Sequence, residues 1–528
     1  MSYSRLLFIL NGNLFVLIPF IFYFSTMGVT IGFGDTALLV DAIRQKVIES
    51  HVNNHPFTVV MGVLFDYLLP FDDIARRANF VSVIFGSFTV SAFYFLVLNE
   101  VRSKLMAMLA ASLLMVSHSM WWHSTIIENY AVSAFFSVVA LLLWQALRNT
   151  RNENYLYWLC VVAGLSVSNH IQMSFLCVGV ACTGILFART VPGKFCSIIG
   201  RCMIGAVVGL LPWLILLLID AVKSGDFSVA LKGALWGSFS GTFFSGDFYA
   251  SLKDVFYLLW FQSPAFLLLI MGVYGFLNTF RASSQDKFSD VGILVFFLLN
   301  TLNFAFYATW DKFAFLLNSF VVLSFYMAVG ISRFYGKIKD DAFLRTIFLF
   351  WVVGAIIAPL VLYSNIASWA ESPRSVWAYR YNNNYSSNLY RHNEFVVNPD
   401  KSEYVDVKNF SLAIFEKLPK NSIFLDDDSR TYYPLALYFQ KYYNMRPDVQ
   451  IIMMNSWGID GWGLDSGSLS EKVKHSLRND IPFFLATKNV PFHGFVKDIE
   501  STLPVRFLPF YLDEKHFIYK MESIRDSH

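Results

Sequence analysis

Charged residues are scarce in this chain of 528 residues, of which only 15% are Asp, Glu, Lys or Arg. Soluble proteins carry about a quarter. Hydrophobic residues make up 55% of the chain and aromatic residues 18%, so the sequence predicts a polytopic membrane protein and excludes an ordinary soluble domain. The net charge of +3 is small and spread out, and it therefore favours neither nucleic acid nor an acidic protein as a partner.

Cysteine and the common catalytic motifs are scarce too. All 5 cysteines lie in the apolar part of the chain, so no disulfide framework is predicted. The sequence has no phosphate-binding P-loop, no dinucleotide glycine fingerprint and no nucleophile elbow. The histidines lack a zinc-binding spacing, which argues against a dedicated zinc site. The N-terminus lacks a small-residue cleavage site, so we expect an uncleaved first span.

Long apolar runs are what the chain has in abundance. Windows of about 20 apolar residues predict about eleven membrane spans. These spans are 6–24, 79–98, 105–120, 126–147, 155–169, 171–188, 202–220, 254–277, 289–308, 313–332 and 344–364. Basic residues gather in the connections on one side, which is therefore predicted to be cytoplasmic. The protein is expected in the bacterial inner membrane rather than the endoplasmic reticulum, with its C-terminal region periplasmic.

The composition divides the chain into three parts. Residues 1–364 form an apolar transmembrane module with an outer-face loop at 25–78, residues 365–404 read as a linker, and residues 405–528 alternate strand-like and helical segments. The predicted fold class is an α-helical polytopic membrane protein with a small C-terminal α/β extracytoplasmic domain, whose sheet is largely parallel. Asp426-Asp427-Asp428 would end a strand, either as a metal or sugar ligand or as a solvated turn.

The densest polar stretch follows the first span. Asp35 precedes an apolar-periodic run and so occupies the N-cap position of a helix on the membrane surface. His55-Pro56 opens a second apolar helix. A carboxylate fixed at a helix start near a histidine is either an ordinary cap or a general base acting on a lipid-borne substrate.

Two further polar clusters lie on the same predicted side. Glu128 stands at the head of a span, where an ionisable group is costly unless it is used or paired; it is either functional or part of a salt bridge or cap. Trp121 and Trp122 are interpreted as interfacial anchors. Arg76-Arg77 run against the positive-inside tendency, which indicates either an anionic partner or ordinary phospholipid headgroups.

The order of these motifs resembles the GT-C superfamily of polyprenyl-phosphate-sugar-dependent glycosyltransferases, and within it the family of the animal transmembrane O-mannosyltransferase of plexin-type receptors and its bacterial relatives. The resemblance is carried by Gly34-Asp35-Thr36, His55-Pro56, Ala78-Asn79-Phe80-Val81-Ser82, Trp122 with Glu128-Asn129-Tyr130, Gly164-Leu165 with His170, and the C-terminal stretch 424–455. The chain departs from the family pattern where Leu38 replaces a Glu and Phe57 replaces a second Pro.

The resemblance implies an inverting transfer of a sugar such as mannose from a polyprenyl-phosphate donor to an acceptor hydroxyl on the non-cytoplasmic face. It makes Asp35 the general base, with His55 orienting Asp35 or the phosphate and Glu128 steering the acceptor or a second donor group. Arg76, Arg77 and His170 would meet the donor phosphate. The acceptor would be a protein or an envelope glycan. No metal ion is obligatory, although Asp35 and Glu128 leave room for a divalent one.

Two other classes of function stay open. A lipid or glycan transporter or flippase would also place polar groups in spans, but transporters place them near mid-bilayer and often in matched broken helices. Here the ionisable groups gather at one end of the spans. A non-catalytic membrane scaffold is supported only by the departures from the family pattern.

Overall fold

The computed structural model describes residues 17–33, 35–237, 248–262, 266–282, 287–306, 312–370, 392–425, 435–453, 466–485, 490–514 and 517–524. The chain forms two compact units. The first, called here the helical unit, comprises Met1–Met27, Ala42–Phe71 and Arg77–Ser364. The second, called the sheet unit, comprises Gly28–Asp41, Asp72–Arg76 and Asn365–His528.

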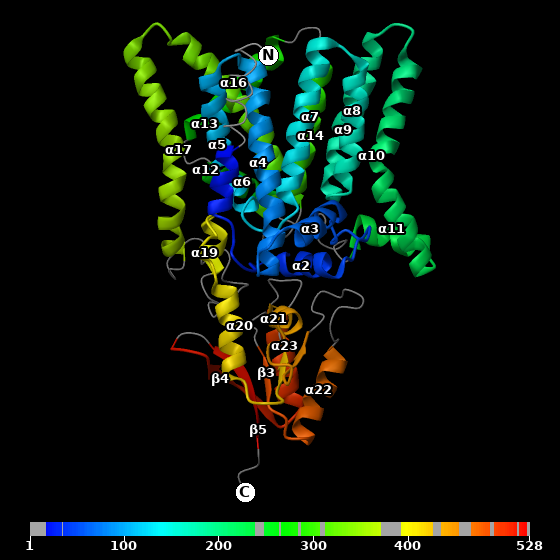
Figure 1. Cartoon of the computed structure of the whole chain (residues 1–528), viewed down its shortest axis with the longest axis vertical. Coiled ribbons are helices and arrows are strands. Elements are labelled where there is room, and N and C mark those ends of the chain that lie inside the picture. Colours follow the sequence, from blue (N-terminus) through cyan, green and yellow to red (C-terminus); the bar gives the residue numbers. More distant parts are fainter. Residues whose placement is uncertain are drawn as a thin grey trace. The chain divides into compact units, whose positions relative to one another are not determined.

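Seven helical segments of the described chain are long and apolar enough to cross a membrane (Figure 1). They are α4 (Ile74–Val101), α7 (Tyr130–Thr150), the continuous η1 and α9 (Ile171–Met173 and Ser174–Thr190), α10 (Phe195–Ser224), α14 (Lys287–Phe306), α16 (Leu317–Lys337) and α17 (Ala342–Ala370). The shorter helices are α2 (Thr36–Gln45), α3 (Pro56–Leu68), α5 (Lys104–Met115), α6 (His118–His123), α8 (Glu153–Val167), α11 (Phe227–Leu235), α12 (Phe248–Gln262), α13 (Phe266–Ala282) and α15 (Lys312–Phe315). A mostly helical membrane protein is thus confirmed.

Several of the predicted spans take a different form. The predicted span 254–277 is two helices, α12 and α13, whose axes differ by 101°. The predicted span 105–120 is the 12-residue α5 followed by the short α6. At 1.5 Å per residue, a helix of this length covers about 18 Å, well short of a hydrocarbon core of about 30 Å. Most of the predicted first span, 6–24, lies outside the described residues.

Glycine allows two pairs of helices in the helical unit to touch backbone to backbone. A Cβ atom at Gly209 of α10 would lie 2.2 Å from the carbonyl oxygen of Val161 in α8. A Cβ atom at Gly275 of α13 would lie 1.9 Å from the carbonyl oxygen of Tyr326 in α16. Because membrane helices associate mainly through close packing, these glycines fix which helices are neighbours.

The sheet unit contains a five-stranded sheet in the order β2-β1-β3-β5-β4. Its strands are β1 (Ile423–Leu425), β2 (Gln450–Ile452), β3 (Phe483–Leu485), β4 (Val505–Tyr511) and β5 (Phe517–Ser523), and its helices are α19 (His392–Val397), α20 (Asp406–Lys417), α21 (Leu435–Tyr443), α22 (Ser466–Arg478) and α23 (Val490–Thr502). The predicted small α/β domain is confirmed. Its sheet is mixed rather than largely parallel, because β5 runs antiparallel to both β3 and β4. Asp426-Asp427-Asp428 lie outside the described residues.

Candidate functional site

The start of α3 places His55 in a buried polar junction of the helical unit. His55 precedes Pro56, the first residue of the helix, and has a left-handed backbone with φ 53°. Its Nδ1 lies 3.1 Å from the carbonyl oxygen of Asn169, and its Nε2 lies 3.1 Å from the amide nitrogen of Asn129. Because a carbonyl oxygen only accepts, Nδ1 carries the proton and Nε2 accepts from the amide. The His55 ring is therefore neutral, and both of its nitrogens are engaged.

Asn169 is the centre of this junction. Its Oδ1 accepts from the Thr58 hydroxyl at 2.6 Å, and its Nδ2 donates to the carbonyl oxygen of Asn129 at 2.8 Å and to the hydroxyl of Ser133 at 2.9 Å. All four of these residues are buried. The bonds tie the turn after α8 to the starts of α3 and α7, three segments that are far apart in the sequence. We call these residues, with His55, the polar junction.

His170 lies at the edge of the polar junction and stacks on His55. The two ring centroids are 5.1 Å apart, with 10° between the ring planes. The Nδ1 of His170 accepts from the backbone N–H of Gln172 at 3.0 Å, which leaves Nε2–H as the donor of the neutral ring. Burial lowers the pKa of His55 to about 4 and the pKa of His170 well below its usual value. The junction therefore offers a neutral N–H donor.

Two residues of α4 hold the backbone beside Glu128. The Oδ1 of Asn79 accepts from the N–H of Ile127 at 2.7 Å, and the hydroxyl of Ser82 accepts from the N–H of Glu128 at 3.2 Å. Glu128 itself is buried and comes directly before Asn129 of the polar junction. The motif spanning 78–82 thus orders the segment that carries Glu128.

Arg77 is held by an acidic partner inside the helical unit. Its Nε donates to Asp66 Oδ1 at 2.8 Å, and one of its terminal nitrogens donates to the carbonyl oxygen of Phe71. Arg44 reaches the other oxygen of Asp66 at 3.1 Å. Arg77 is 13% and Asp66 10% exposed, so Arg77 lies in a nearly buried ion pair, and because Arg44 and Arg77 share one carboxylate the group of three keeps a net positive charge.

Asp35 and Arg76 belong to the sheet unit. The carbonyl oxygen of Asp35 accepts from the N–H of Leu39 at 2.9 Å, the first bond of α2, so Asp35 occupies the position of a helix N-cap. The backbone N–H of Arg76 donates to Asp73 Oδ1 at 3.1 Å, and the Thr30 hydroxyl donates to Asp73 Oδ2 at 2.9 Å. Asp73 thus joins the two short upstream segments of this unit.

The predicted site residues accordingly fall into two groups. His55, His170, Glu128 and Arg77 belong to the helical unit, where the rings of His55 and His170 stack on each other, whereas Asp35 and Arg76 belong to the sheet unit. Sequence reasoning missed Asn129 and Asn169, which organise the junction. Both asparagines are next to residues that the motifs singled out. An amide side chain between apolar spans was the signal that could have identified them, since a buried amide needs hydrogen-bond partners.

The tryptophans of α6 are not interfacial anchors, so that interpretation was wrong. Trp121 and Trp122 are 5% and 2% exposed. The indole N–H of Trp121 donates to the Thr26 hydroxyl at 2.9 Å, which satisfies it inside the protein. Among the described residues, no cluster of three or more His, Cys, Asp or Glu has an arrangement that would hold a metal ion.

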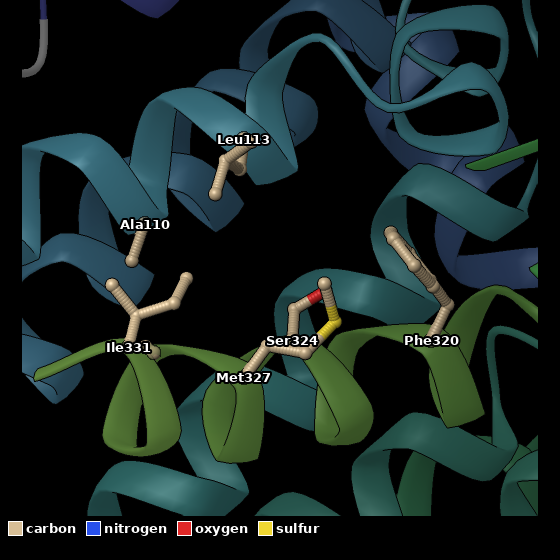
Figure 2. A pocket seen from close by; sticks show the side chains of 7 residues that line it. Ala110, Leu113, Phe320, Ser324, Met327 and Ile331 are labelled. Carbon is tan, nitrogen blue, oxygen red and sulfur yellow. The ribbon is translucent and has the colours of Figure 1, made fainter. Parts of the chain in front are cut away.

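A small apolar cavity lies between α5 and α16 (Figure 2). Phe320, Ser324, Met327 and Ile331 of α16 face Ala110 and Leu113 of α5, and Ala328 completes the lining. The empty space between these side chains is about 260 Å³, a figure that includes open solvent. The Ser324 hydroxyl is the one polar side-chain group in this lining, so the feature is a small gap in apolar helix packing and not a site for a sugar or a phosphate.

Comparisons with known proteins find one matching family profile and solved structures of similar fold. The family profile described as "Protein O-mannosyl-transferase TMEM260 N-terminal domain" matches residues 46–192. ArnT from Cupriavidus metallidurans bound to undecaprenyl phosphate is 12% identical, with a TM-score of 0.56 over 97% of this chain and 98% of that one. The same ArnT in the apo state is 11% identical, with a TM-score of 0.58 over 99% of each chain. The comparison with curated proteins finds no match.

Proposed function

We propose that the chain is a GT-C-type membrane glycosyltransferase that moves a sugar from a polyprenyl-phosphate donor to an acceptor hydroxyl, with inversion at the anomeric carbon; the family profile over residues 46–192 and the ArnT-like fold support this proposal. The undecaprenyl phosphate bound to ArnT supports a lipid-linked donor. The name of the matching family supports mannose as the sugar and a protein hydroxyl as the acceptor, with an envelope glycan as the other acceptor class. We place the reaction on the periplasmic face of a bacterial inner membrane.

Asp35 is the general base of the proposed reaction. A carboxylate is ionised at neutral pH and can accept a proton, whereas an alcohol keeps its proton at this pH. The acceptor hydroxyl therefore loses its proton to the base only while its oxygen forms the bond to the anomeric carbon. In the same step the bond between the anomeric carbon and the phosphate oxygen breaks. The proton passes to Asp35, and polyprenyl phosphate leaves with the bonding electrons. Glu128 steers the acceptor.

The polar junction is the observation that carries this proposal. The leaving phosphate gains negative charge in the transition state and is stabilised by preorganised donors. His170 has one such donor, because its Nδ1 already accepts from Gln172 and only Nε2–H remains. His55 holds the His170 ring by stacking. Arg76 and Arg77 supply positive charge to the same phosphate.

This transfer step needs no metal ion. If a divalent ion takes part, Asp35 and Glu128 are the carboxylates that would bind it. A transfer assay with and without a chelator decides whether a metal takes part, and loss of activity on chelation followed by recovery with Mg²⁺ or Mn²⁺ would show that it does.

Sugar transfer by the purified full-length chain in proteoliposomes tests the proposal, with polyprenyl-phosphate mannose as donor and envelope protein as acceptor. Asp35→Asn should lower transfer by about 10²–10⁴-fold, as expected for loss of a general base. The matched control is Asp226→Asn, because Asp226 also caps a helix, accepting from the N–H of Ser228 at 2.7 Å, and Asn caps about as well as Asp. Unchanged transfer by Asp35→Asn would reject the assignment, and donor translocation without transfer would favour a flippase.

A further inference from the structure

The sheet unit is built from more than the C-terminal part of the chain. It also contains Gly28–Asp41 and Asp72–Arg76, so the segments that carry Asp35 and Arg76 are packed within the same compact unit as Asn365–His528. Contacts inside this unit therefore decide where the Asp35 carboxylate lies. The stretch from α19 to α20 contacts Gly32 and Phe33, shortly before Asp35 in the sequence.

An aromatic cluster packs against the chain just before Asp35. The ring of Phe33 meets the ring of Phe395 edge to face, with centroids 5.4 Å apart, and Phe395 lies 4.9 Å from Tyr404. Phe33 and Phe395 are 2% and 1% exposed. At Gly32 a Cβ atom would lie 2.8 Å from Cζ of Phe395. The Phe395 ring thus occupies the space that a side chain at position 32 would need.

A buried lysine fixes the backbone that carries this ring. Lys401 is 1% exposed, and its Nζ donates to the carbonyl oxygen of Phe395 at 2.6 Å and also to the carbonyl oxygen of Asn398. The same Nζ lies 4.6 Å from the centroid of the Phe395 ring. Burial lowers the pKa of Lys401 well below its usual value. Burying an amine is unfavourable unless its donors are used, and here they hold the turn after α19.

The far end of the same segment is held by α21. Asp41 accepts from Lys441 Nζ at 2.6 Å and from the Tyr442 hydroxyl. The segment is therefore fixed on both sides of Asp35, by Phe395 before it and by α21 after it. Neither attachment contains a residue with an obvious chemical role in sugar transfer.

We propose that Phe395 and Lys401 are positioning residues for Asp35, which makes the C-terminal part of the chain a component of the proton-transfer geometry. This inference rests on the proposed function, because it takes Asp35 to be the base. Lys401 acts through Phe395, and Phe395 acts through Gly32 and Phe33 on the backbone that ends at Asp35.

The expected effect is on turnover rather than on donor binding. A misplacement of about 1 Å in a catalytic group lowers the rate by up to roughly 10²-fold. Phe395→Leu and Lys401→Met should therefore lower kcat by about 10–100-fold and leave the KM for the donor within about twofold, since they act on the backbone next to Asp35, and His170 and Arg77 belong to the helical unit.

The test compares these variants with Phe507→Leu in the full-length protein. Phe507 is also a buried phenylalanine of the sheet unit, but it packs in the hydrophobic core formed with the sheet. Unfolding curves identify the variants that fold. If Phe395→Leu does not fold, Lys401→Met is used for the test in its place. A double-mutant cycle with Asp35→Glu adds a readout specific to positioning: Phe395→Leu should lower kcat much less when the base is already displaced by a methylene.

The possible results separate the two proposals. A wild-type chain that transfers no sugar overturns the proposed function and this inference together. A wild-type chain that needs Asp35 but tolerates Phe395→Leu and Lys401→Met as well as Phe507→Leu overturns only the positioning role. Selective loss of kcat in the two variants, with a non-additive cycle against Asp35→Glu, supports it.

Discussion

Removal of the Asn169 side chain is the sharpest test of the polar junction. Asn169→Ala deletes the three side-chain hydrogen bonds at 2.6, 2.8 and 2.9 Å to Thr58, Asn129 and Ser133. Asn169 is 0% exposed, so water does not replace the lost partners without rearrangement. Each buried group left without a partner costs about 1–3 kcal/mol. Because a hydroxyl can turn toward another acceptor, we expect a total loss of about 3–5 kcal/mol.

The matched control is Asn152→Ala. The side chain of Asn152 accepts one hydrogen bond, from the backbone N–H of Asn154 at 3.0 Å, at an exposed helix start. Loss of such a cap costs about 1 kcal/mol. Free energies of unfolding from denaturant titrations in detergent, followed by tryptophan fluorescence, measure both variants on the same scale.

A second variant apportions the effect to one bond. Thr58→Val removes the hydroxyl that donates to Asn169 and keeps the shape of the side chain. In the Asn169→Ala background Thr58→Val should restore about 1 kcal/mol, because no orphaned hydroxyl remains. Two results would refute the polar junction as the organising element of these helix starts. One is a loss of unfolding free energy in Asn169→Ala that lies within about 1 kcal/mol of the loss in Asn152→Ala, and the other is the absence of coupling between Asn169→Ala and Thr58→Val.

Three further predictions concern stability. The pKa of His55 is about 4 in the folded protein and about 6.5 in the unfolded protein, so the unfolded state binds more protons between these pH values. The free energy of unfolding should therefore fall by about 3 kcal/mol as the pH drops from 6.5 to 4. His55→Gln, measured at both pH values, should remove this part of the pH dependence. Gly209→Ala should lower the free energy of unfolding by about 1–3 kcal/mol or more, because the atom facing the new methyl group is a backbone oxygen. The control Gly200→Ala, where a Cβ atom would have nothing within 4 Å, should be neutral or slightly stabilising. Unfolding by SDS titration distinguishes the two variants. Asp66→Asn should lower the free energy of unfolding by about 2 kcal/mol, because it weakens the nearly buried ion pair with Arg77, and an unchanged value would contradict that role.

Local patterns in the sequence predicted the helix starts and the strands well. His55-Pro56 begins α3, and a helix follows Asp35, because proline at the first helical position and an acidic residue before the helix are local signals. The β-branched and aromatic runs at 423–425 and 483–485 became adjacent parallel strands. Apolar periodicity and turn residues act over a few positions, so one sequence suffices to detect them.

Other features depend on contacts between distant segments and were not visible in the sequence. Apolar tryptophans face either lipid or protein, and hydropathy does not distinguish the two, which is why Trp121 and Trp122 were misread. The sequence between α12 and α13 interrupts the apolar run only briefly, at Gln262-Ser263-Pro264, so a hydropathy window of about 20 residues still reads a single span. The attachment of Asp35 to the sheet unit depends on Phe395, more than 300 positions away by residue number, and no local pattern specifies such a partner.

The hydrogen bonds of His55 argue against His55 as the general base of the proposed reaction. Its Nδ1–H donates to Asn169 and its Nε2 accepts from Asn129, so His55 takes up no further proton unless one of these bonds breaks. Burial acts in the same direction by lowering its pKa to about 4. A general base at neutral pH has to be a group with a free lone pair and no such penalty. We therefore propose that His55 orients His170 rather than accepts the acceptor's proton, which leaves that proton to a carboxylate and makes Asp35 the residue on which turnover depends.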